Sequence, residues 1–218
     1  LSGLQSLLIG VHTLEPSELH TLVDSLARLT QLQTLAIRGS GKRGWPKLAA
    51  REWRFPQLIE LALERQAEMP RVSAPKLQRL ELFSLENSSK QLATLLAECA
   101  QCLRVLELKS NGEVPRGLHP AISIDDIACL VNLQTLSLYI PLPASACGVL
   151  AGLSRLESLE IWLAPSSNAS FDVASMLASL PRLHSALIWA GTDVASVSSS
   201  ASSATLAPTA AAPCLKNL

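Results

Sequence analysis

The chain has 218 residues, of which 48% are hydrophobic and 17% are charged, so it can bury a sizeable core. Lys plus Arg and Asp plus Glu both total 18, and this balance excludes a chain-wide field that would attract nucleic acid or an anionic membrane. No apolar run approaches the roughly 20 residues of a membrane span, so no membrane partner is expected. The five cysteines are irregularly spaced, which favours a reducing, intracellular location, cytoplasmic or nuclear.

One apolar pattern recurs eight times: a first position, followed by further apolar residues at plus 3 and plus 5. The plus 3 and plus 5 pair has the period of a strand face, while apolar residues at minus 3 and minus 6 extend to helical spacing. Each copy is therefore predicted to hold a helix, a turn and a short parallel strand. The first positions are Leu4, Leu32, Leu58, Leu77, Leu103, Leu133, Leu156 and Leu183.

In chain order, a first helix is predicted to open at residues 16–18, and apolar residues with helical spacing follow it up to Leu26. Residues 38–57 are predicted to form an inserted basic loop with two tryptophans, Trp45 and Trp53. The third and fourth first positions lie only 19 residues apart. Prolines in that interval leave no room for a full helix, so one side of the molecule should be thin there.

Later in the chain, two pairs of residues have the spacing of a capping box and predict helix starts, Ser88 with Gln91 and Ser123 with Asp126. Residues 1–192 are expected to form the repeat domain. Residues 193–213 are mostly Ser, Ala and Thr and should form a disordered insertion. Residues 214–218 restore the start of a further, truncated repeat, and the chain is expected to be a fragment of a larger protein.

Residues 1 to about 190 resemble a leucine-rich-repeat protein of the intracellular kind. The family motif carries Asn at plus 8, and only Asn111 conforms, so the chain is similar to the irregular repeats of F-box subunits and nucleotide-binding immune receptors. A single unit cannot bury its apolar face, whereas eight stacked units share one core. The expected fold is an α/β solenoid, a horseshoe of about eight repeats with parallel strands on the concave face and helices on the convex face.

Candidate binding residues come from strand positions that alternate away from the core. Four of the eight aromatic residues of the chain share the plus 6 column, and exposed aromatics in a groove are typical binding anchors. In the alternative interpretation, loops or further repeats cover them and some of the acids are merely solvated. The candidates are Arg38, Glu64, Phe83, Lys109, Tyr139, Trp162 and Trp189 at plus 6, and Glu81, Glu107 and Glu160 at plus 4. Glu60 and Arg79 occupy the plus 2 column.

Cys99 and Cys102 have the spacing of a redox or metal half-site. Cys99 shares a helical face with three leucines, however, and no second pair of ligands follows, so buried structural thiols are expected. The four histidines show no ordered pairing with Ser or Asp, and no phosphate-binding glycine loop is present. The sequence therefore predicts no enzyme activity, no metal and no cofactor.

The favoured function is a protein–protein interaction module that binds another protein on its concave strand face, as part of a recognition or scaffold protein. The alternative is a structural subunit of a ribonucleoprotein or other assembly, with an RNA contact through the basic loop 38–57. Trp45 or Trp53 would then stack on a base. This alternative is weaker because the chain lacks a basic stripe.

Overall fold

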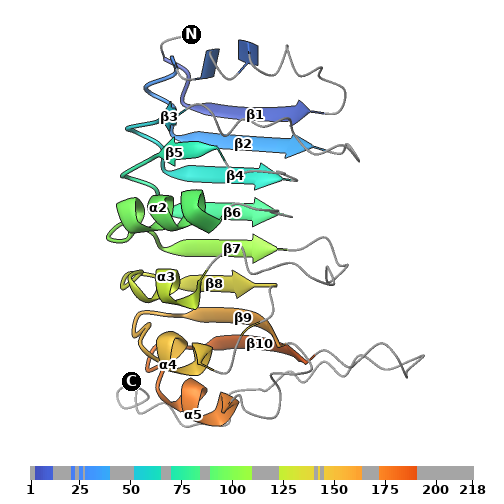
Figure 1. The fold of residues 1–218 in the computed structure, drawn as a ribbon, viewed down its shortest axis with the longest axis vertical. Coiled ribbons are helices and arrows are strands. Elements are labelled where there is room, and N and C mark those ends of the chain that lie inside the picture. The colour runs from blue at the N-terminus through green and yellow to red at the C-terminus, as the bar shows by residue number, and fades with distance from the viewer. Residues whose placement is uncertain are drawn as a thin grey trace, which may run out of the picture.

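The computed structural model describes residues 3–11, 21–22, 25–26, 28–39, 52–64, 70–83, 89–109, 123–139, 142, 145–163 and 172–190. These residues form a mixed α/β structure around one parallel sheet (Figure 1). The strands of this sheet are β1 (Ser6–Val11), β2 (Thr34–Gly39), β4 (Glu60–Glu64), β6 (Arg79–Phe83), β7 (Val105–Lys109), β8 (Thr135–Leu138), β9 (Ser158–Leu163) and β10 (Ser185–Ala190). The helices are α2 (Ser89–Cys99), α3 (Ile124–Ala128), α4 (Ala146–Ala151) and α5 (Val173–Ala178).

The eight strands lie in the sheet in the order in which they occur along the chain, and every neighbouring pair is parallel. Crossovers between parallel strands are right-handed, so connections that always advance in one direction all lie on the same side of the sheet. Figure 1 shows the consequence, with the helices in a row along the sheet, near the ends where the strands begin. Each helix from α2 to α5 contacts the next one in that row.

The register of the sheet aligns the apolar positions of all eight sequence copies. Leu106 at plus 3 pairs with Leu80 on one side and with Leu136 on the other, and Leu108 at plus 5 pairs with Leu82 and Leu138 in the same way. The side chains at these positions join leucines of the helices and turns in one continuous buried cluster. The predicted strand positions and the shared core are therefore confirmed.

A repeated set of backbone hydrogen bonds spaces the turns that lead into the strands. The carbonyl of the residue after each first position accepts two N–H groups from the next copy; Gln78, for example, accepts from Arg104 and Val105 at 2.8 and 3.0 Å. The same pair of bonds recurs at Gln5, Gln33, Ile59, Arg104, Gln134 and Glu157. These bonds therefore fix the register of neighbouring strands before the strands themselves begin.

Two connections, the predicted basic loop 38–57 and the short interval before the fourth copy, contain strands in their described residues, which the sequence did not predict. Residues 52–54 form β3 (Glu52–Arg54) and residues 71–73 form β5 (Arg71–Ser73), and these two short strands pair with each other in a second parallel sheet. The predicted basic loop 38–57 therefore ends in a strand and a turn. Trp53 and Phe55 fill the core there, with exposed fractions of 1% and 0%. The absence of a full helix before the fourth copy agrees with the described residues 70–77, which hold β5 and a turn.

The turns and caps follow the local sequence. In three copies a proline stands two residues before the first-position leucine, and the N–H of that leucine bonds the carbonyl three residues back, as from Leu77 to Ala74 at 3.1 Å. Proline suits the second position of such a turn because its φ is preset and its missing N–H is not needed. Ser123 and Asp126 form the predicted capping box of α3. Ser88 lies outside the described residues.

Two of the predicted domains, residues 193–213 and 214–218, lie outside the described residues, as does Trp45. Among the described helices, none combines the length and the apolar character needed to cross a bilayer.

Candidate functional site

The sheet face opposite the core presents three parallel columns of side chains, at plus 2, plus 4 and plus 6 of each copy. Because the strands pair without a shift in register, each column runs straight across the sheet. Of the ten predicted site residues, Arg38 is exposed and the others are half-buried. The half-burial arises because side chains on adjacent strands stand only about 4.8 Å apart and cover one another.

The register shows which predicted residues are neighbours. Glu64, Phe83 and Lys109 follow one another across β4, β6 and β7, and Trp162 pairs directly with Trp189 across β9 and β10. The N–H of Tyr139 bonds the carbonyl of Leu108 at 2.9 Å, which continues the ladder between β7 and β8 by one residue. The aromatic residues of the plus 6 column thus lie on one face, as the sequence predicted.

A charged network occupies the middle of this face. The Arg79 guanidinium donates from Nε to Glu81 and from Nη2 to Glu107 at 2.8 Å. Glu107 also accepts from the Lys109 ammonium at 2.6 Å, and that ammonium lies 5.7 Å from the centre of the Phe83 ring. One arginine therefore joins the plus 2 and plus 4 columns, and one lysine joins the plus 4 column to an aromatic residue at plus 6.

Arg79 was placed in the plus 2 column by the sequence but was not included in the predicted site. Partial burial by itself lowers the pKa of Arg79, but the hydrogen bond to Glu81 and the charges of Glu81, Glu107 and Glu60 outweigh it and raise that pKa above its usual value. The sequence could have indicated this role, because Arg79 has Glu60 in its own column and Glu81 and Glu107 in the adjacent one, and arginine pairs readily with carboxylates.

A second cluster forms around Glu160. Its carboxylate accepts hydrogen bonds from the Tyr139 hydroxyl and, at 3.3 Å, from the Ser137 hydroxyl. Burial raises the pKa of Tyr139 to about 12, together with the hydrogen bond to Glu160 and the charges of Glu160 and Glu107. Ser137 is buried, with 6% of its surface exposed, and sequence reasoning missed it because a serine on a strand carries no distinguishing pattern.

Trp189 carries an unusual feature at the far end of the face. Its indole N–H is buried and has no hydrogen-bond acceptor among the described residues. Trp162 beside it is half-buried. Unsatisfied buried donors cost roughly 1–3 kcal/mol, so the Trp189 N–H destabilises this end of the face, which offers a partner apolar area from the two half-buried rings.

Of the two tryptophans proposed for base stacking, Trp53 is not available on the surface, and Trp45 lies outside the described residues. Trp53 packs edge-on against Phe55, with ring centroids 6.2 Å apart and an interplanar angle of 79°. Arg54 pairs with Glu52 at 2.8 Å on the same short strand. Within the described part of the segment 38–57, an aromatic residue and a cation are thus already occupied by neighbours in the protein.

The expectation of buried thiols holds for Cys99 but not for Cys102. Cys99 is buried, and burial raises the pKa of its thiol to about 12, whereas Cys102 is half-exposed at a turn. In the ranges that the structure describes, no three His, Cys, Asp or Glu side chains gather in a way that could hold a metal ion.

Comparison of the chain with protein-family models, with curated proteins and with solved structures finds no match.

Proposed function

We propose that the chain is a leucine-rich-repeat solenoid that binds another protein on the exposed face of its sheet. The observation that carries the proposal is the plus 6 column, which brings four half-buried aromatic side chains onto one face beside an ordered set of charges. Aromatic anchors surrounded by polar groups are the usual composition of the energetic centre of a protein interface. The solenoid assignment draws on the eight in-register copies and the single shared core.

The charges on this face favour a protein partner over a nucleic acid. The strands of the large sheet place five acidic and three basic side chains on it, so the face is acidic overall. Glu81, Glu107 and Glu160 lie in one column beside the aromatics. The acids are Glu60, Glu64, Glu81, Glu107 and Glu160, and the bases are Arg38, Arg79 and Lys109.

The carboxylates at the centre of the face are preorganised for recognition. Arg79 and Lys109 hold Glu107 from two sides, and Tyr139 and Ser137 hold Glu160. Side chains that are already ordered lose less conformational entropy on binding, which improves affinity. Fixed acceptors of this kind orient a partner that carries arginine or lysine next to an apolar segment.

The proposed location is a reducing, intracellular compartment. Four cysteines in the described residues are free thiols, including the buried Cys99 and the exposed Cys129. Proteins exposed to oxidising conditions more often pair such thiols.

The proposal is tested by replacing the two neighbouring tryptophans at the end of the face. We expect Trp162→Ala and Trp189→Ala each to weaken binding of a captured partner by about 2 kcal/mol or more, because each removes a large apolar anchor. The partner is captured from cell extract on the immobilised chain after nuclease treatment, purified, and titrated by calorimetry. Thermal melting of both variants should stay close to that of the parent chain.

A matched control uses Leu8→Ala, since Leu8 is the most exposed large apolar side chain described on this face, at 66%, and lies on β1, away from the aromatic residues. Its replacement should leave the affinity unchanged. Equal affinity of the parent chain and both tryptophan variants would refute the sheet face as the binding surface. A partner that is captured from untreated extract but lost after nuclease treatment would instead favour the ribonucleoprotein alternative.

A further inference from the structure

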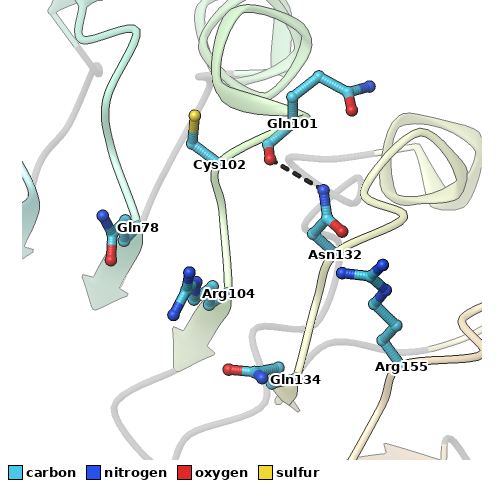
Figure 2. Close-up of a pocket in the computed structure, with 7 residues that line it drawn as sticks. All are labelled: Gln78, Gln101, Cys102, Arg104, Asn132, Gln134 and Arg155. Atoms are coloured by element: carbon cyan, nitrogen blue, oxygen red, sulfur yellow. Dashed lines mark hydrogen bonds between the residues drawn. The ribbon is translucent and has the colours of Figure 1, made fainter.

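A polar cleft of about 350 Å³ lies beside the sheet, at the turns that lead into β7, β8 and β9. Figure 2 shows the side chains that line it. Gln78, Arg104 and Gln134 come from three successive copies at the residue after the first position, and Asn132 and Arg155 come from the turns. The cleft is distinct from the aromatic face, because none of its lining residues belongs to the plus 2, plus 4 or plus 6 columns.

The backbone hydrogen bonds of the turns set the spacing of this cleft. The carbonyls of Gln78, Arg104 and Gln134 each accept two N–H groups from the next copy, which aligns the three residues in a row at about strand spacing. Asn132 donates from its side chain to the carbonyl of Gln101 at 2.9 Å and so ties two neighbouring turns together. Figure 2 shows Arg104 between Gln78 and Gln134, and Arg155 reaching toward Asn132.

The cations of the cleft have no ion-pair partner among the described residues. Arg104 and Arg155 are both exposed, and neither forms an ion pair with a described residue, whereas Arg54 and Arg79 elsewhere both do. The nearest acid of the same row is Glu157, whose carboxylate lies 3.5 Å from the Gln134 amide nitrogen. The cleft thus combines two free guanidinium groups with amide side chains, and has one acidic neighbour at its border.

We propose that this cleft binds an acidic segment of a protein in extended conformation. Guanidinium groups form paired hydrogen bonds with carboxylate or phosphoryl oxygens, and the amides of Gln78, Gln134 and Asn132 match the donors and acceptors of a peptide backbone. A drug-like small molecule fits less well, because such ligands need mostly apolar walls. Nucleic acid fits less well because none of the described lining residues is aromatic, so the cleft has no ring on which a base could stack.

The experiment measures fluorescence anisotropy of a labelled short peptide that alternates serine and glutamate, titrated with the intact chain. Two companion peptides replace glutamate by glutamine or carry phosphoserine, and a single-stranded DNA oligonucleotide of similar length is the polyanion arm. We expect binding of the glutamate or the phosphoserine peptide, and whichever binds more tightly identifies the oxyanion. Arg104→Gln and Arg155→Gln should each weaken that binding roughly tenfold, as loss of a charge-assisted hydrogen bond does.

Arg182→Gln is the control, because Arg182 has the same place in its turn as Arg155 and is exposed, but does not line the cleft. It removes the same charge and should leave binding unchanged, and so should Trp162→Ala on the sheet face. The bound peptide should also slow alkylation of Cys102, which lines the cleft, without slowing that of Cys129. Tighter binding of the DNA or the glutamine peptide, or equal loss with Arg182→Gln, would overturn the proposal.

Discussion

At the scale of single residues, Tyr139 offers a direct measurement, because it is the single tyrosine of the chain. Burial, followed by the Glu160 carboxylate, raises its pKa from 10.0 to about 12. A raised pKa means that folding favours the protonated phenol. Its stabilising contribution is therefore complete below pH 10, the unfolded value, and is lost as the pH rises toward about 12.

We expect the ultraviolet absorbance of tyrosinate to titrate near pH 12 in the folded chain and near pH 10 in denaturant. Glu160→Gln should lower the folded midpoint, because it removes the charge that opposes ionisation. Circular dichroism at each pH shows whether the chain is still folded. A folded midpoint at the denatured value would mean that the contact with Glu160 does not form.

The surroundings of Trp53 decide how much its replacement changes the free energy of unfolding. Its side chain is buried against Phe55, yet its indole N–H has no acceptor among the described residues. Trp53→Phe should change the free energy of unfolding by only about 1 kcal/mol, because removing the unsatisfied donor offsets the lost volume. Trp53→Ala should cost about 3–5 kcal/mol through the cavity it leaves. Urea denaturation compares the two, and similar losses would show that the N–H is satisfied in solution.

At the scale of elements, two helices with serine at the N-cap provide a matched comparison. Ser123 before α3 makes both bonds of a capping box with Asp126, whereas Ser145 before α4 makes no side-chain cap hydrogen bond. Ser123→Ala should destabilise the chain by about 1 kcal/mol, and Ser145→Ala by less than about 0.5 kcal/mol. Thermal melting of the two variants is the measurement, and a larger loss for Ser145→Ala would contradict the assigned caps.

The short strands β3 and β5 show how a connection substitutes for a helix. Trp53, Phe55 and Val72 cover the same core that Leu92 and Leu96 of α2 cover further along. Because successive strand residues point to opposite sides, a strand of three residues is long enough to direct one apolar side chain inward and to pair with the neighbouring connection. For β5, the close spacing of the third and fourth first positions explains the strand, because a helix of several turns does not fit there.

At the scale of the whole molecule, burial falls toward the two edges of the described sheet. Leu106 at plus 3 in the middle has an exposed fraction of 0%, whereas the equivalent Leu7 on β1 is only partly buried. A stack in which each unit contacts its neighbours loses half of those contacts at a terminal unit. The outer strands should therefore be the least stable part of the described structure.

We expect Leu106→Ala to reduce the free energy of unfolding by about 2–5 kcal/mol, and Leu7→Ala by clearly less, although both occupy the same repeat position. Urea denaturation gives both values. Amide hydrogen exchange should likewise be faster in β1 and β10 than in β6, β7 and β8. Equal losses for the two leucine variants would show that the outer strand is covered as well as the central one.

The sequence by itself determined the strand positions, their order and the inward-facing leucines, because a repeated apolar period leaves each unit one way to bury its face. It also placed the aromatic column, since alternation on a strand assigns every second residue to the other face. The tertiary structure alone decided the fate of Trp53 and the pairing of Arg79, Glu107, Tyr139 and Glu160. These contacts depend on residues from different copies meeting across the sheet. The cleft likewise depends on side chains of successive turns, such as Gln78, Arg104 and Gln134, coming together.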